Sequence, residues 1–301
     1  MRKNSFSRLL STALALFFLS SSYQAQGAWA GVTGSVSPSV SRVENISRTV
    51  DPGTRKDATL YTVAFSAGQT RQIARSWFLG LSLEGDLLFE PKFSRNDRHA
   101  LGPLLSLQKK FGLGPFAPVL SLETSYHYQG HELRSARGEI SNTSLRFSKR
   151  LSEPLKVGAH VGIQDRQARG AVFDHSQRYA RVEATFDFLD QWSVRGAASI
   201  IDGPQTANAN PQRWADALSG VKGDNVARYY QTLPNEVTEL YGPGWLSYSP
   251  EAKSWEGTLS LRYQSVDRWS LEAQASATRT KDEAVQRYPS QSLSLSFIYP
   301  F

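Results

Sequence analysis

Apolar and polar residues alternate along most of the chain, and the pattern continues to the last residue. In the terminal run 291–301, serines alternate with the apolar side chains of Leu293, Leu295, Phe297, Tyr299 and Phe301. Successive side chains of a strand point to opposite faces, so this run predicts a strand with one apolar and one polar face. Because a strand at the end of the chain has no following segment to cover it, we expect its free edge to pair with the first strand and close a barrel.

Twelve stretches share this alternation. We predict strands over residues 32–43, 59–66, 77–89, 100–111, 116–128, 140–149, 155–164, 179–188, 192–201, 255–264, 269–279 and 291–301. An even strand count is typical of single-chain bacterial barrels. The sequence therefore predicts an all-β fold, a closed antiparallel up-and-down transmembrane β-barrel of about 12 strands.

The predicted connections differ in length between the two ends of the barrel. Those after odd strands are long (44–58, 90–99, 129–139, 165–178, 202–254 and 280–290), and those after even strands are short (112–115, 150–154, 189–191 and 265–268), except 67–76. Outer-membrane barrels combine short periplasmic turns with long external loops. On this assignment the outward aromatics gather near the periplasmic rim: Phe65, Trp77, Phe111, Phe116, Phe188, Trp192, Tyr263, Trp269 and Phe301. Trp and Tyr favour that interface.

The N-terminus indicates export. Arg2, Lys3 and Arg8 precede an apolar run over residues 9–19 that is too short to span a bilayer as a helix. We predict a signal peptide over residues 1–30, with cleavage after Gly27 or Ala30. Residues 31–301 then form a single barrel in the cell outer membrane.

The terminal strand that ends in Phe301 resembles the C-terminal signature of Gram-negative outer-membrane β-barrel proteins. The resemblance implies insertion by the barrel-assembly machinery and contact with outer-membrane lipid. The segment 111–118 and the loop at 172–174 are similar to those of uncharacterised outer-membrane proteins. No named porin or barrel enzyme is matched closely.

Composition narrows the function classes. The formal charge is +7 and the pI about 9.6, but basic and acidic residues are interspersed and no Lys/Arg cluster of five occurs, so we do not expect nucleic-acid binding. The chain has no cysteine, which excludes disulfides and thiolate metal sites. The mean hydropathy of −0.40 is compatible with a transmembrane barrel, in which only alternate residues face lipid. We expect no cofactor and no metal.

The ionisable side chains that the alternation directs inward number seven of each sign, which predicts no strong preference for anions or cations. The candidate lumen residues are Glu84, Asp86, Glu123, His127, Arg146, His160, Arg181, Glu183, Arg195, Arg262 and Glu272. They could line a solute path or form a salt-bridge network that holds the barrel.

Catalytic patterns of barrel enzymes are not found. The phospholipase and lipid A deacylase families carry His-x-Ser on a strand, and no histidine here is followed by Ser at that spacing. The omptin proteases combine Asp-x-Asp with Asp-x-His. Glu84-Gly-Asp86 is only similar to the first motif. Asp97-Arg98-His99 has the spacing of the second, so the pair of motifs is incomplete. We therefore expect no enzyme and no catalytic residues.

The long external loop at 202–254 has a composition of its own. Segments 211–220 and 224–234 each carry helix start and stop signals, so we predict two short helices. The loop aromatics, which could pack the loop against the rim or bind a ligand, are Trp214, Tyr229, Tyr230, Tyr241 and Trp245.

The leading functional hypothesis is a narrow passive channel for small polar solutes with this loop as its constriction. The alternative is a closed structural or surface-interaction barrel whose external loops bind a partner. The sequence leaves the oligomeric state open.

Overall fold

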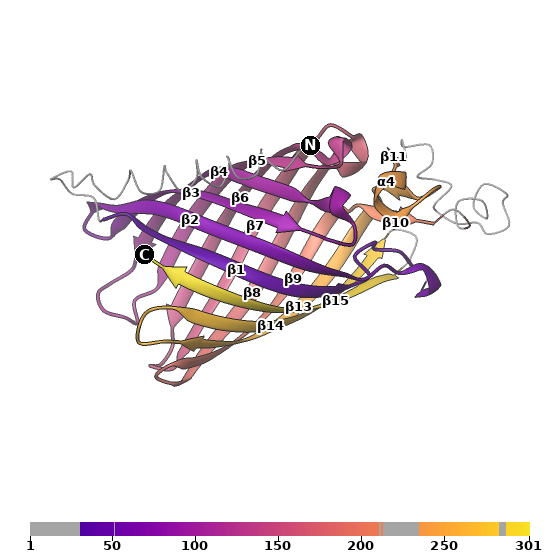
Figure 1. The fold of residues 1–301 in the computed structure, drawn as a ribbon. Helices are drawn as coiled ribbons and strands as arrows, with labels where there is room; N and C mark the ends of the chain where they lie inside the picture. Colours follow the sequence, from indigo (N-terminus) through magenta and orange to yellow (C-terminus); the bar gives the residue numbers. More distant parts are fainter. Residues whose placement is uncertain (1–30, 51, 211, 213–234, 283–286) are drawn as a thin grey trace.

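The computed structural model describes residues 31–50, 52–210, 212, 235–282 and 287–301. Twelve antiparallel strands form a closed barrel in the order β1-β15-β14-β13-β9-β8-β7-β6-β5-β4-β3-β2, strongly tilted against the barrel axis (Figure 1). Its strands are β1 (Thr33–Glu44), β2 (Ala58–Ala74), β3 (Trp77–Phe89), β4 (Arg98–Lys110), β5 (Val119–His131), β6 (Gly138–Arg150), β7 (Leu155–Ala168), β8 (His175–Leu189), β9 (Trp192–Pro204), β13 (Glu251–Gln264), β14 (Ser270–Asp282) and β15 (Arg287–Pro300). The predicted fold class and strand count are confirmed.

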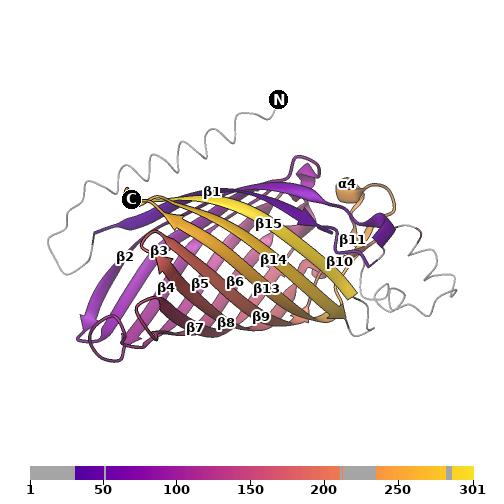
Figure 2. The same cartoon turned by 90° about the horizontal axis from the view of Figure 1, so that it is seen from below.

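Closure occurs between the first and last strands. β1 and β15 pair in register from Ser35 opposite Pro300 to Glu44 opposite Gln291 (Figure 2). The backbone N–H and C=O of Phe301 both bond to Gly34, at 3.0 and 3.1 Å. Pairing of the terminal strand with the first strand, predicted from the alternation, leaves no open sheet edge in the barrel.

Among the described residues, four 3₁₀ turns, a short helix and a small sheet lie at one end of the barrel. Single 3₁₀ turns lie in four connections: η1 (Pro52–Thr54), η2 (Ser94–Asn96), η3 (Arg134–Ala136) and η4 (Ala171–Phe173). The long loop contains α4 (Thr238–Tyr241) and a separate three-stranded sheet of β10 (Ala207–Ala209), β12 (Leu246–Tyr248) and β11 (Asn235–Glu236). Over the described part of the chain, no helix is long and apolar enough to cross a membrane.

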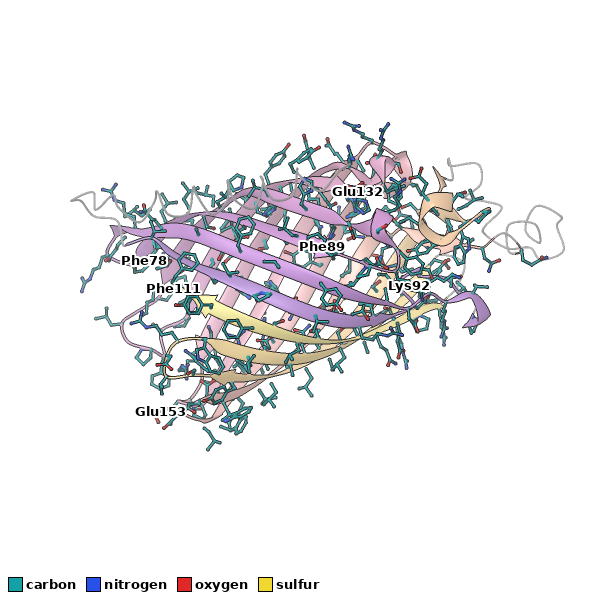
Figure 3. The ribbon with its side chains drawn as sticks, viewed as in Figure 1. Phe78, Phe89, Lys92, Phe111, Glu132 and Glu153 are labelled. Carbon is teal, nitrogen blue, oxygen red and sulfur yellow. The ribbon has the colours of Figure 1, made fainter. Side chains whose placement is uncertain are left out.

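The two ends of the barrel differ in part as the sequence predicted. Two expected connections are wrong: β14 ends at Asp282 and β15 begins at Arg287, so 280–290 is not a long loop, and the turn expected at 112–115 spans 111–118. The two longest connections, 45–57 and 205–250, lie at the end that we call the long-loop end. At the opposite, short-turn end, four of the five turns have five residues or fewer: 75–76, 151–154, 190–191 and 265–269. The side chains of Phe111 and Glu153 lie at the short-turn end, and those of Lys92 and Glu132 at the other (Figure 3).

Strand β2 is longer than the sequence indicated. It continues past Ser66 to Ala74 and stays paired with β3 almost to its end, through a register shift between Gln72 and Ala74. The expected connection 67–76, which broke the rule of short turns, is therefore wrong: the turn consists of residues 75–76. As a consequence Phe65 lies in the middle of β2 opposite Gly85, not at the rim.

The outer surface of the barrel is apolar. Large hydrophobic side chains point outward on alternate positions, with exposed fractions up to 63% for Leu293. Near the short-turn end Trp192, Tyr263, Trp269 and Phe297 form a chain of rings with centroids 5.0 to 5.8 Å apart. Three of them lie on β9, β13 and β15, and Trp269 immediately precedes β14. An exposed apolar band edged by aromatic rings suits a lipid bilayer and its interface.

Other predictions fall outside the described residues. The signal peptide over residues 1–30, the two predicted helices apart from residue 212, and Trp214, Tyr229 and Tyr230 all do so. The start of β13 at Glu251 rather than at residue 255 shortens the predicted long loop.

Candidate functional site

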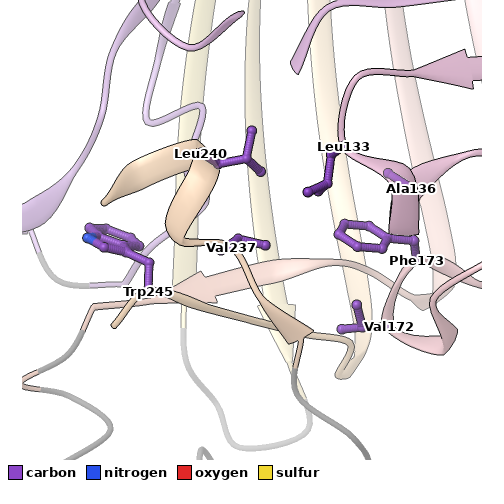
Figure 4. Close-up of a cluster of buried hydrophobic side chains, with 7 residues drawn as sticks. All are labelled: Leu133, Ala136, Val172, Phe173, Val237, Leu240 and Trp245. Atoms are coloured by element: carbon purple, nitrogen blue, oxygen red, sulfur yellow. The ribbon is translucent and has the colours of Figure 1, made fainter. Parts of the chain in front are cut away.

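The candidate site has two parts, the lumen of the barrel and a cap over its long-loop end. The buried hydrophobic residues of the described chain gather in this cap. Its larger cluster joins three connections (Figure 4): Leu133, Ala136, Val172, Phe173, Val237, Leu240 and Trp245. A second cluster contains Ala207, Ala209, Tyr248 and Tyr288. Burial of apolar surface stabilises both clusters and holds the loops of each against one another.

Polar contacts tie the long loop to its neighbours. The Asn208 side-chain amide donates to the Ser47 carbonyl oxygen at 2.6 Å, and the Thr206 hydroxyl donates to the Val172 carbonyl oxygen at 3.1 Å. The Tyr248 and Tyr288 hydroxyl oxygens lie 3.0 Å apart. These bonds connect the loop with 45–57, 169–174 and the start of β15, so the cap is attached on several sides of the mouth.

Two of the predicted loop aromatics belong to this cap. Trp245 is only 6% exposed, and its ring centroid lies 5.3 Å from that of Tyr241. The Tyr241 ring meets Phe93 edge to face, also at 5.3 Å, and Arg95 pairs with Glu239 at 3.2 Å. In the structure these two rings and Glu239 pack the loop against the neighbouring loop 90–97.

A buried carboxylate lies beside this contact. Glu90 is 1% exposed, accepts a hydrogen bond from the Asn96 side-chain amide at 2.8 Å, and its backbone N–H donates to Asp97 Oδ1 at 2.7 Å. Burial removes the carboxylate from water and raises the pKa of Glu90 from 4.5 to about 7, more than the Asn96 bond lowers it.

We expect the cap to loosen as the pH rises. Because the pKa of Glu90 is higher in the packed loop than in an opened one, the packed form is favoured fully below pH 4.5 and loses this advantage as the pH rises through about 7. Amide hydrogen exchange in 90–97 and 237–248, corrected for the intrinsic pH dependence, should show less protection at high pH. Glu90→Gln should remove the effect, and Glu132→Gln, an exposed carboxylate of the next loop, should retain it. Equal pH dependence in all three proteins would contradict this role of Glu90.

The lumen carries the predicted charged residues on two different walls. Glu84 and Asp86 lie on β3, and Glu123 and His127 lie on β5. The remaining seven lie on strands β6 to β14: Arg146, His160, Arg181, Glu183, Arg195, Arg262 and Glu272. The strand register aligns Arg146, His160 and Arg181 on three adjacent strands.

The structure brings most of this second group together. Glu183 contacts Arg146 at 3.3 Å and Arg181 at 3.8 Å, and it also pairs with Arg195. Arg262 Nε donates to Glu272 Oε2 at 2.7 Å. The balanced total predicted from the sequence therefore hides an uneven distribution, because face alternation does not tell which charges lie at the same height.

Two cavities open into the short-turn half of the lumen. One of about 230 Å³ lies among the charged residues of β6 to β14, and one of about 310 Å³ lies between β1 and β4. Both are lined largely by hydroxyl groups, glycines and charged side chains. No group of three or more His, Asp or Glu side chains suited to a metal ion occurs among the described residues.

Similar folds are found among solved outer-membrane proteins at low sequence identity. An outer-membrane channel from Pseudomonas putida F1 is 12% identical, with a TM-score of 0.53 over 93% of this chain and 98% of that chain. The outer-membrane channel DcaP of Acinetobacter baumannii is 11% identical, with a TM-score of 0.44 over 93% and 99%. The NanC porin is 7% identical, with a TM-score of 0.46 over 87% and 98%.

At such identities the similarity shows the fold alone. A scan against protein-family models and a search of curated proteins find no match. The chain has the fold of an outer-membrane β-barrel.

Proposed function

We propose that the protein is an outer-membrane channel through which small polar solutes diffuse, with the cap restricting entry from outside. Outer-membrane barrels place long loops outside and short turns in the periplasm, so the long-loop end faces the exterior. The cap then meets a solute first, and the two cavities lie near the periplasmic exit.

The observation that carries this proposal is the polar character of the lumen in its short-turn half. Around the smaller cavity the wall presents Ser148, Thr185, Ser193 and Ser260, and around the larger one Ser35, Ser66 and Ser82. Short hydroxyl side chains occupy little of the interior of a twelve-stranded barrel and can hydrogen-bond to a passing solute. An apolar ligand would find few partners there.

Liposome swelling tests the proposal. Vesicles that contain the purified protein should swell in isosmotic solutions of small uncharged polar solutes, and the rate should fall steeply with solute size because the interior is narrow. Protein-free vesicles give the baseline. Swelling no faster than this baseline for every solute would overturn the channel and favour the alternative of a closed barrel with partner-binding loops.

A further inference from the structure

The strongest concentration of charge in the lumen is the cavity between β6 and β14. Four basic side chains line it, Arg146, Lys156, Arg195 and Arg262, against two acidic ones, Glu183 and Glu272. Arg262 and Glu272 neutralise each other in a short ion pair. The other four leave an excess of positive charge on this wall.

Glu183 holds the arginines in place without neutralising them. Its side chain is 15% exposed and contacts Arg146, Arg181 and Arg195, so a single negative charge faces three positive ones. The strand register places Gly158 directly beside Glu183, where an added Cβ would lie 3.1 Å from the Glu183 side chain. Each guanidinium has five N–H donors, and one contact with Glu183 leaves most of the others for a ligand.

Of the basic side chains that line this cavity, Lys156 has no ion-pair partner among the described residues. Lys156 on β7 lies opposite Thr185 on the neighbouring strand β8, and Thr185 lies opposite Arg195 on β9. Lys156, Arg195 and the hydroxyls of Thr185, Ser193 and Ser260 therefore offer several donors to one small volume of about 230 Å³.

The lumen wall formed by β1 to β4 carries less charge. The cavity of about 310 Å³ between β1 and β4 is lined by glycine, serine and threonine with scattered larger residues, and Glu84 is its one charged lining residue. Of the two cavities in the short-turn half of the lumen, only the one between β6 and β14 is therefore lined by positively charged hydrogen-bond donors.

We propose that the cavity around Lys156 and Arg195 binds small oxyanions bearing carboxylate or phosphate groups, and that it makes the channel selective for anions. This inference rests on the proposed function and specifies its solute class. Arginine forks and an ammonium provide charge-assisted hydrogen bonds to such groups. Positive charge near a narrow exit attracts anions and repels cations, which adds selectivity even without tight binding.

The test is the reversal potential of the purified full chain in planar bilayers under a KCl gradient. The wild type should show the sign of chloride preference. Lys156→Gln should lower the chloride-to-potassium permeability ratio by more than about fivefold, because one unit charge at close range in water changes the partitioning of each ion about fivefold, in opposite directions. Inorganic phosphate added at millimolar concentration should reduce the KCl conductance of the wild type more than that of Lys156→Gln.

Lys109→Gln is the matched control. It removes the same charge near the same end of the barrel. The Lys109 ammonium, however, lies over the rings of Trp77 and Phe111, and Phe111 is exposed. The permeability ratio of this variant should therefore equal that of the wild type. A conducting wild type with no chloride preference, or an equal change in both variants, would overturn the anion site and leave the channel standing. No conductance in any of the proteins would overturn the channel itself.

Discussion

Replacing residues 206–249 by a two-residue Asn-Gly turn is expected to raise the single-channel conductance severalfold. The loop departs from two adjacent strands: Pro204 at the end of β9 lies opposite Glu251 at the start of β13, and the Gln205 N–H donates to the Pro250 carbonyl oxygen at 3.0 Å. An Asn-Gly turn suits such a hairpin. The barrel should fold unchanged, because the described part of the replaced segment contributes no strand to it.

A cross-link supplies the reverse experiment. The chain has no cysteine, so the double variant Phe93→Cys, Tyr241→Cys carries the only thiols, at two side chains whose rings are in contact. Joining them with a short reducible thiol cross-linker should lower the frequency of open events, and reduction should restore it. If neither removing the loop nor fixing it altered the current, the cap would not control entry.

Leu259→Arg is expected to destabilise the folded barrel by about 2–4 kcal/mol, the cost of arginine on a barrel's lipid face at the bilayer midplane. Leu259 is 59% exposed and lies on β13 midway between the outward aromatic residues Trp255 and Tyr263. A charge there has neither water nor a lumen partner. Denaturant unfolding in lipid vesicles, followed by tryptophan fluorescence, measures the loss.

Thr258→Arg is the control for this substitution. It introduces the same side chain one residue away, where the alternation of β13 directs it to the polar lumen. Its effect on the free energy of unfolding should be much smaller than that of Leu259→Arg. Equal losses for the two variants would mean that the two faces of the strand do not meet different solvents.

The strands could be predicted from the sequence because lipid outside and polar groups inside impose an alternation that a single chain displays directly. The prediction failed where that constraint is weak. On β2 the outward residues beyond Phe65 include Gln69 and Arg71, so the apolar pattern stops although backbone pairing with β3 continues. Backbone hydrogen bonds extend a strand without leaving a mark in the side-chain pattern.

The charged side chains of the lumen show a second limit to what the sequence predicts. Alternation places Glu183 inside, but its three arginine partners come from β6, β8 and β9 at heights set by the strand register. That register depends on turn lengths and on the shear of the closed barrel. Likewise the aromatic content of the long loop was evident, while its packing against Phe93 and Phe173 depends on which loops the closed barrel brings together.

Single-channel conductance of the intact protein and of the cap-replacement variant in planar bilayers tests whether the lumen is a solute path under a loop cap. We expect small discrete current steps for the intact chain and larger, steadier steps for the variant. Absence of current above that of the protein-free bilayer in both proteins, with their barrels verified as folded, would contradict this expectation.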